Sequence, residues 1–193
     1  MIDYIIDLDK SITIYFNSCH SPFFDFVMHA ASNGLTWIPL FALLLYLLYK
    51  NFSTKEFLLS LLFIAILITL TDQISFQIFK NGFERLRPCH EPDLFGIIKT
   101  FNGECGGDFG FISSHATNYF GLAVFNICLL SKKYKILLPL LLLWALIISY
   151  SRIYLGVHYF GDVLGGCIVG SLIGLFVYKL FKYIDNRYIL KNS

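Results

Sequence analysis

Apolar residues follow one another along most of this chain in long runs, separated by short polar segments. Four runs are each bounded by Lys, Gly or Pro and cover residues 35–49, 57–79, 137–149 and 163–181. A fifth run, at 116–130, begins with more polar residues but is long enough to cross a bilayer if its helix starts near Ser113. The pattern therefore predicts a bundle of membrane-spanning helices.

The N-terminal part has a different pattern, in which apolar and acidic residues share helical spacing over a segment that is short and acidic for a membrane span. We expect residues 3–17 to form an amphipathic helix at the membrane interface. A second short helix should begin at Pro22, because proline suits the first helical turn, and end near residue 31. The expected organisation is an interfacial segment at 1–33, a membrane domain at 34–185 and a cytoplasmic tail at 186–193.

Composition supports this reading. Of the 193 residues, 56% are hydrophobic and 15% charged, whereas soluble domains average about 25% charged residues. The 20 Phe and 12 Tyr residues exclude a disordered chain. A net charge of +2 is too balanced to indicate nucleic-acid binding. We expect an all-α polytopic membrane bundle of about five to six transmembrane helices with the interfacial helix at its N-terminus.

The charges sort to the two sides of the predicted topology. One side holds Glu56 and Asp185 together with most of the basic residues, namely Lys50, Lys55, Lys132, Lys133, Lys135, Lys179, Lys182, Arg187 and Lys191. The positive-inside rule makes that side cytoplasmic and puts the 80–113 loop and the 150–162 turn outside. Asp72, which falls within a span, should face the bundle interior.

Two cysteines, Cys89 and Cys105, fall in the outward loop. An oxidising compartment would allow them to pair, so we predict a disulfide that closes this part of the loop. A pair of free thiols is the alternative.

The outward loops also hold groups that bind anions. Lys80 and Arg87 are seven residues apart, so both would point to one face if the preceding helix continued to Pro88. Two cations would then converge on one anion. Cations that anchor a helix end at the membrane surface would explain the same pair.

A helix start is predicted at Ser113, Ser114 and His115. Serine is a favoured N-cap, and the unpaired N–H groups of a helix start attract anions, which would bring a bound anion next to His115. Capping without catalysis would also explain these residues.

The third polar cluster consists of Arg152, His158 and Asp162. Because His158 and Asp162 are four residues apart, a helix would let the carboxylate reach one ring nitrogen and leave the other free as a base or nucleophile. Arg152 adds a planar, permanently charged donor for phosphate oxygens. A structural His–Asp pair is the alternative, but three such clusters on one predicted side favour a phosphate site.

The three clusters read Lys80-x6-Arg87-Pro88, Ser113-x-His115 and Ser151-Arg152-x5-His158-x3-Asp162. In order and spacing, they resemble the three-part signature of the type-2 phosphatidic acid phosphatase superfamily of membrane lipid phosphatases. One departure is present. The central element of the family usually reads Pro-Ser-Gly-His, whereas Ile112 and Ser114 replace the proline and the glycine here.

The resemblance implies a role for each residue. His158 would be the nucleophile that forms a phosphohistidine, Asp162 would hold its imidazole, and His115 would be the general acid. The groups implied to hold the phosphoryl oxygens are Lys80, Arg87, Ser113, Ser114 and Arg152. No metal and no cofactor is implied. The implied partner is a phosphorylated lipid at the outer leaflet, with the active site facing the periplasm of a bacterial inner membrane.

Several alternatives stay open. The substrate could be a polyprenyl pyrophosphate, phosphatidylglycerol phosphate, phosphatidic acid or a phosphorylated lipid A, with one or two phosphates removed. The same residues could transfer phosphate to a second acceptor, or bind or transport an anion without turnover. A metal site formed by His115, His158 and Asp162 is disfavoured, because three neighbouring cations would oppose a dication. The sequence leaves the oligomeric state open.

Overall fold

The structure is a computed structural model that describes residues 2–189. Its main helices are α1 (Ile2–Asn17), α2 (Pro22–Ser32), α3 (Ile38–Asn51), α4 (Thr54–Gln73), α6 (Ser114–Leu130), α7 (Leu137–Tyr154) and α8 (Phe160–Ile184). Shorter helices are η1 (Gly34–Trp37), η2 (Ile74–Lys80), α5 (Asn81–Phe83), η3 (Pro92–Leu94), η4 (Phe101–Gly103) and η5 (Asp185–Ile189). The predicted all-α class is confirmed. Residues 190–193 of the expected tail lie outside the described part of the chain.

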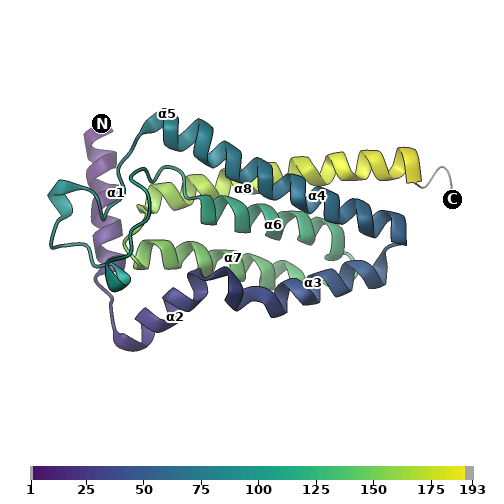
Figure 1. Ribbon diagram of the computed structural model, residues 1–193, viewed down its shortest axis with the longest axis horizontal. Coiled ribbons are helices and arrows are strands. Elements are labelled where there is room, and N and C mark those ends of the chain that lie inside the picture. The colour runs from purple at the N-terminus through teal and green to yellow at the C-terminus, as the bar shows by residue number, and fades with distance from the viewer. Residues whose placement is uncertain (1, 190–193) are drawn as a thin grey trace.

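Helix α6 is the centre of the bundle. It contacts α4, α7 and α8, which run alongside it, while α3 lies along the outside (Figure 1). Helix α1 crosses one end of the bundle, and the long 84–113 connection covers the same end. The chain therefore gathers its N-terminal helix and its irregular segments at one end of a set of long helices.

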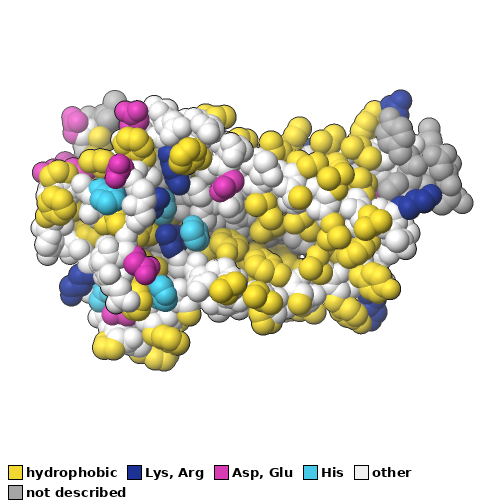
Figure 2. Space-filling model, viewed as in Figure 1, with side chains coloured by type: hydrophobic (Ala, Val, Ile, Leu, Met, Phe, Trp, Pro, Cys, Tyr) yellow, Lys and Arg dark blue, Asp and Glu magenta, His cyan; other side chains and the backbone are white. Residues whose placement is uncertain are grey.

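Within residues 2–189, four helical segments are long and apolar enough to cross a membrane: Gly34–Asn51, Thr54–Phe83, Leu137–Tyr154 and Phe160–Arg187. The fifth predicted span corresponds to α6, which has 17 residues and lies among the others. Figure 2 shows hydrophobic side chains over much of the long helices, with acidic and histidine side chains gathered at the α1 end. A bilayer would surround such an apolar surface, as expected for an integral membrane protein.

The contact between α6 and α8 depends on small residues. An added Cβ at Gly170 would lie 2.2 Å from the Thr117 carbonyl oxygen, and one at Gly174 would lie 2.5 Å from that of Gly121. The same holds at Gly166, where the Ser113 carbonyl oxygen would be 2.7 Å away. Glycines at four-residue spacing let the two backbones approach more closely than any larger residue allows.

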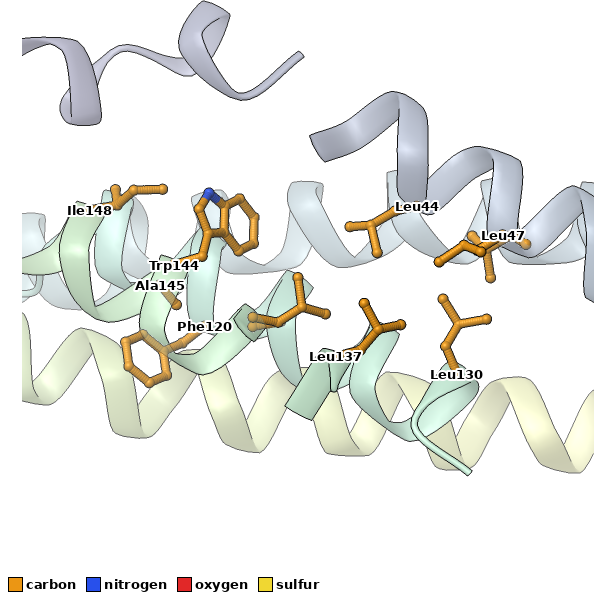
Figure 3. Close-up of a cluster of buried hydrophobic side chains, with 11 residues drawn as sticks. Leu44, Leu47, Phe120, Leu130, Leu137, Trp144, Ala145 and Ile148 are labelled. Atoms are coloured by element: carbon orange, nitrogen blue, oxygen red, sulfur yellow. The ribbon is translucent and has the colours of Figure 1, made fainter. Parts of the chain in front are cut away.

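A large apolar cluster joins α3, α6 and α7 (Figure 3). Trp144 of α7 is 3% exposed and packs edge-to-face against Trp37, Phe41 and Tyr119. Edge-to-face aromatic pairs add to the stabilisation that burial alone provides. This cluster holds α3 against the bundle, although most of α3 stays exposed.

Polar contacts tie the N-terminal helices to the end of α7. The Asn17 amide donates to the carbonyl oxygens of Lys99 and Tyr154, each at 2.8 Å. The Tyr154 hydroxyl donates to Asp25 Oδ1 at 2.6 Å, and His20 Nδ1 lies 2.7 Å from the same oxygen. The N-terminal segment is therefore fastened to the bundle by specific hydrogen bonds.

In the second predicted span, the condition for a shared face of Lys80 and Arg87 is not met, and the expectation for Asp72 is wrong. Its helix ends at Phe83 rather than at Pro88, because Glu84 adopts a left-handed conformation with φ of 47°. Asp72 is exposed rather than turned to the interior, and it accepts a hydrogen bond from the Asn118 amide at 3.4 Å. The helix therefore cannot bring Lys80 and Arg87 to one face.

Candidate active site

A folded loop, not a helix, positions Arg87. Its backbone N–H donates to the Asp108 carbonyl at 2.9 Å, and the Gly110 N–H donates to the Arg85 carbonyl at 2.8 Å. A disulfide between Cys89 and Cys105, with their Cα atoms 6.1 Å apart, joins the two sides of this loop. The two sides of the loop are thus held together next to the bundle.

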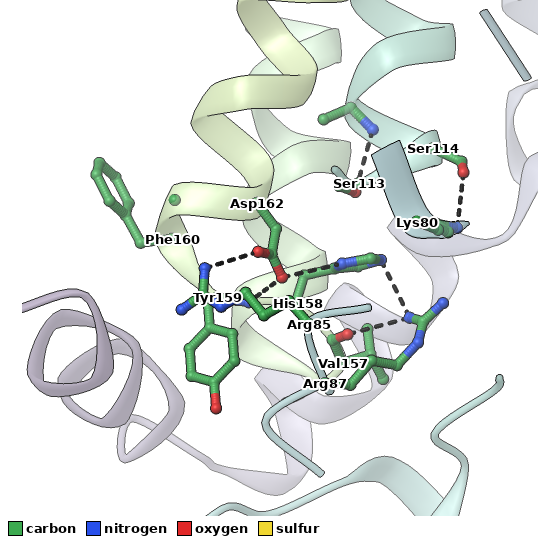
Figure 4. A network of polar contacts seen from close by, with 12 residues as sticks. Lys80, Arg85, Arg87, Ser113, Ser114, Val157, His158, Tyr159, Phe160 and Asp162 are labelled. Atoms are coloured by element: carbon green, nitrogen blue, oxygen red, sulfur yellow. Dashed lines mark hydrogen bonds and ion pairs between the residues drawn. The ribbon is translucent and has the colours of Figure 1, made fainter. Parts of the chain in front are cut away.

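The Arg87 guanidinium reaches His158 (Figure 4). Its Nη1 lies 3.1 Å from His158 Nε2 and also donates to the Val157 carbonyl at 3.0 Å, while Nε donates to the Gly107 carbonyl at 2.5 Å. Because guanidinium has no acceptor, Nε2 of His158 accepts in this contact and carries the lone pair. Burial lowers the pKa of Arg87, and the nearby Asp162 carboxylate partly offsets this effect.

Asp162 faces the other nitrogen of the same ring. His158 Nδ1 lies 3.5 Å from Asp162 Oδ2, although α8 begins only at Phe160, so a helix is not what brings the pair together. The Tyr159 N–H donates to Asp162 Oδ2 at 3.0 Å. The side chains of His158 and Asp162 are both almost fully buried. Burial and the charges of three nearby cations, Arg87, Arg152 and Lys80, lower the pKa of His158 well below its usual value. The arrangement favours a neutral His158 with its lone pair on Nε2.

Lys80 and Ser114 are joined directly. Lys80 Nζ donates to Ser114 Oγ at 2.8 Å, and Ser75 Oγ lies 2.9 Å from the same oxygen. The serine that departs from the family pattern therefore holds the lysine of the first motif. A glycine at this position would have no hydroxyl to offer.

Ser113 begins α6 as its N-cap. Its hydroxyl accepts from the Ala116 N–H at 3.4 Å, and its own N–H donates to the Asp162 carbonyl at 3.0 Å. The side chain has no exposed surface. Its predicted contact with phosphate stays a prediction.

Arg152 and His115 line a cavity of about 330 Å³, together with residues of α2 and the 84–113 loop, among them His29, Ser32 and Glu104. Arg152 Nη1 donates to the Ser32 hydroxyl. His115 also borders a second space of about 240 Å³ between α3, α4 and α6, where Phe41, Ile68 and Leu122 supply an apolar wall. A polar cavity and an apolar gap therefore meet at His115.

The three residues of the disfavoured metal alternative are not grouped as metal ligands among the described residues. In the described part of the chain, three side chains that could ligate a metal have their ligand atoms within 4.8 Å of one another: Cys89, His90 and Cys105. Cys89 and Cys105 form the disulfide. His115, His158 and Asp162 do not form such a group in residues 2–189.

Sequence reasoning missed three residues that contact the site. Arg85 binds Asp162, Asp9 of α1 binds Arg85, and Ser32 of α2 binds Arg152. Arg85 lies inside the first motif, which was a usable signal. Asp9 and Ser32 lie far from the motifs in sequence and carried no signal of their own.

Three cations and a buried His–Asp pair at one end of a membrane bundle are groups suited to phosphoryl transfer, which depends on positioning and on compensation of phosphate charge. The sequence model of the PAP2 superfamily matches residues 57–185, and the chain belongs to this superfamily. The class predicted from the motifs, a membrane lipid phosphatase, is thereby confirmed.

Individual relatives agree with this assignment. A protein named lipid A 4'-phosphatase from Bacteroides thetaiotaomicron is 41% identical over 188 residues, which are 97% of this chain and 83% of the relative. A second protein of that name, from Porphyromonas gingivalis, is 33% identical over 97% of this chain and 79% of its own. The crystal structure of a PAP2-type phosphatidylglycerolphosphate phosphatase from Bacillus subtilis has the same fold, with a TM-score of 0.72, 22% identity and coverage of 96% of this chain and 89% of that one.

Proposed function

We propose that this protein hydrolyses a phosphate monoester on the headgroup of a lipid of the lipid A type, and that the reaction passes through a phosphohistidine at His158. The observation that carries the proposal is the contact of Arg87 with the Nε2 atom of a buried histidine whose other nitrogen faces Asp162. Two relatives that match nearly the whole chain bear the name lipid A 4'-phosphatase, which supports this substrate class.

The reaction would take place in two displacements. Nε2 of His158 attacks phosphorus, so a P–N bond forms and the P–O bond to the lipid breaks, while His115 donates a proton to the departing oxygen. Water then attacks the phosphohistidine, His115 takes a proton from that water, the P–N bond breaks and inorganic phosphate leaves. Lys80, Arg87 and Arg152 would compensate the charge on the equatorial oxygens, with Ser113 and Ser114 as further donors.

The lipid would approach from the membrane. Its phosphate would enter the polar cavity at Arg152 and His115, and an acyl chain would lie in the apolar gap beside Phe41 and Leu122. The basic residues at the opposite end of the helices favour a cytoplasmic position for that end. The site would then face the periplasm of a bacterial inner membrane.

The test is phosphate release by detergent-purified protein from a panel of lipids with EDTA present, using lipid A, phosphatidylglycerol phosphate, phosphatidic acid and a polyprenyl pyrophosphate. We expect release from lipid A by the wild type and none by His158→Ala, with mass spectrometry locating the phosphate that is lost. Release from another lipid alone would overturn the substrate class and keep the phosphatase. Release from no lipid by folded protein would overturn the proposed function.

A further inference from the structure

Arg85 connects the N-terminal helix to the His–Asp pair. Its Nη1 donates to Asp162 Oδ1 at 2.9 Å, and its Nη2 donates to Asp9 Oδ2 at 2.7 Å. Asp162 uses its other oxygen, Oδ2, toward His158. Arg85, Asp162 and His158 therefore form a continuous chain of contacts in Figure 4, and Asp9 extends this chain into α1.

Helix α1 also supplies partners for the first turn of α8. The Gly161 N–H donates to Asp9 Oδ1 at 2.7 Å, and the Phe160 N–H donates to Thr13 Oγ1 at 3.0 Å. These N–H groups have no partner within their own helix, so an acceptor from elsewhere must satisfy them. An added Cβ at Gly161 would lie 2.9 Å from Asp9 Oδ2, so a glycine is needed there for the carboxylate to come this close.

The surroundings hold Arg85 in one orientation. Its guanidinium carbon lies 3.9 Å from the centre of the Tyr159 ring, and the side chain of Asp9 is only 12% exposed. A planar guanidinium can bind two carboxylates through separate N–H groups, which an ammonium cannot do with the same geometry. The position of the Asp162 carboxylate therefore depends on a cation that is itself held by Asp9.

We propose that Asp9 and Arg85 are positioning residues of the active site: Asp9 orients Arg85, and Arg85 orients Asp162 so that its Oδ2 atom faces His158 Nδ1. Neither residue reaches the cavity that would hold the substrate phosphate. The inference rests on the proposed function for its chemistry. It assigns to the N-terminal helix a part in catalysis beyond its place at the membrane surface.

The test combines single and double variants with kcat and KM measured separately. Misplaced partners of a reacting group reduce rates by roughly 10- to 100-fold, so we expect Asp9→Asn to lower kcat by about 10-fold and Arg85→Gln by about 100-fold, with KM unchanged. Arg85→Lys should retain an intermediate kcat, since it keeps the charge but cannot bridge both carboxylates. Asp7→Asn is the matched control, because Asp7 is exposed on the same helix and should leave kcat as in the wild type.

Additivity separates positioning from general stabilisation. If Asp9 acts through Arg85, the double variant Asp9→Asn/Arg85→Gln should be within about threefold of Arg85→Gln alone. Losses that multiply, a change confined to KM, or wild-type kcat in Asp9→Asn would each overturn the proposal. Size-exclusion profiles and thermal unfolding in detergent establish that each variant is folded.

A second measurement needs no lipid. Exchange of ¹⁸O between inorganic phosphate and water reports on attack by His158, since water leaves when the P–N bond forms and a different water returns when it breaks. Slower exchange in Asp9→Asn would support the positioning role even if no lipid in the panel were hydrolysed. In that case, the absence of lipid hydrolysis would overturn only the proposed function. Unchanged exchange in Asp9→Asn would overturn the inference while leaving the phosphatase in place. No exchange and no turnover in the wild type would overturn both.

Discussion

The two ends of the helix bundle are held together by different kinds of interaction. Away from the site, α4, α6 and α8 meet through a cluster of buried apolar side chains, namely Phe63, Leu67, Phe125, Val177 and Phe181. At the α1 end, hydrogen bonds join residues that are 70 to 152 positions apart in the chain, from the Arg87–Val157 contact to the Asp9–Gly161 contact.

This difference teaches where the chain tolerates change. Apolar contacts are non-directional, so residues of similar volume can replace one another at modest cost. Hydrogen bonds to buried charged groups depend on the position of each atom, and losing one partner leaves the other unsatisfied. Substitutions at the two ends should therefore differ in kind as well as in size.

The largest effect is expected from His158→Ala. It removes the proposed nucleophile, and loss of a nucleophile lowers turnover by at least about 10³-fold. Phosphate release by purified protein measures the effect. Val177→Ile in the apolar cluster is the contrasting change and should keep most of the activity. Full turnover by His158→Ala would remove the covalent mechanism.

The next effect is expected from Arg87→Lys. The charge is kept, but one ammonium cannot reproduce the contacts of the guanidinium with Gly107, Val157 and His158. Hydrogen bonds of charged groups contribute about 1.5–3 kcal/mol, so kcat/KM should fall by roughly 10- to 100-fold. Steady-state kinetics would test this, and activity equal to the wild type would mean that charge alone is sufficient at this position.

A larger residue at the contact between α6 and α8 should reduce the stability of the folded protein. Gly170→Val would push side-chain atoms into the Thr117 backbone and should cost about 1–3 kcal/mol in the free energy of unfolding. Gly82→Ala is the matched control, because its added Cβ meets nothing within 4 Å and should leave stability within about 0.5 kcal/mol. Thermal unfolding in detergent compares them. Equal melting temperatures would show that the two helices can separate without cost.

The smallest effect is expected from mild acidification. The attacking imidazole must be neutral, and burial together with Arg87, Arg152 and Lys80 lowers the pKa of His158 below 6.5. More than half of His158 is then neutral at pH 6.5, so kcat should stay above half of its plateau there. Arg87→Gln removes one of these charges and should move the acid limb of the kcat profile to higher pH. A limb that moved to lower pH in this variant would contradict the assignment.

The sequence allowed the long helices to be predicted because their apolar runs are as long as the elements themselves. The N-cap of α6 at Ser113 and the start of α2 at Pro22 followed from local capping rules. The π-helix at Ile74–Lys80 did not, because a change of hydrogen-bond register inside an apolar run leaves no mark in the hydrophobic pattern. Continuation of this helix to Pro88 was the condition for Lys80 and Arg87 to share a face, and the helix ends at Phe83 instead.

The candidate site was predicted through its motif residues but not through their supports. Lys80 and Arg87 lie at the site, yet a loop rather than a shared helical face brings Arg87 there. Asp9 was assigned to an interfacial helix, because an acidic residue on an amphipathic helix looks the same whether it faces water or the start of another helix. Its partner Arg85 is 76 residues away, and only the fold brings them together.

The contacts of Arg87 with the Gly107 and Val157 carbonyls have a consequence for mutational scanning. Both acceptors belong to the main chain, so an alanine substitution at Gly107 or Val157 leaves the oxygen in place. A scan would not detect the role of these two carbonyl oxygens, although they orient a guanidinium at the reacting nitrogen. Replacing single peptide bonds with esters would reveal them, because an ester carbonyl is a weaker acceptor at an unchanged position.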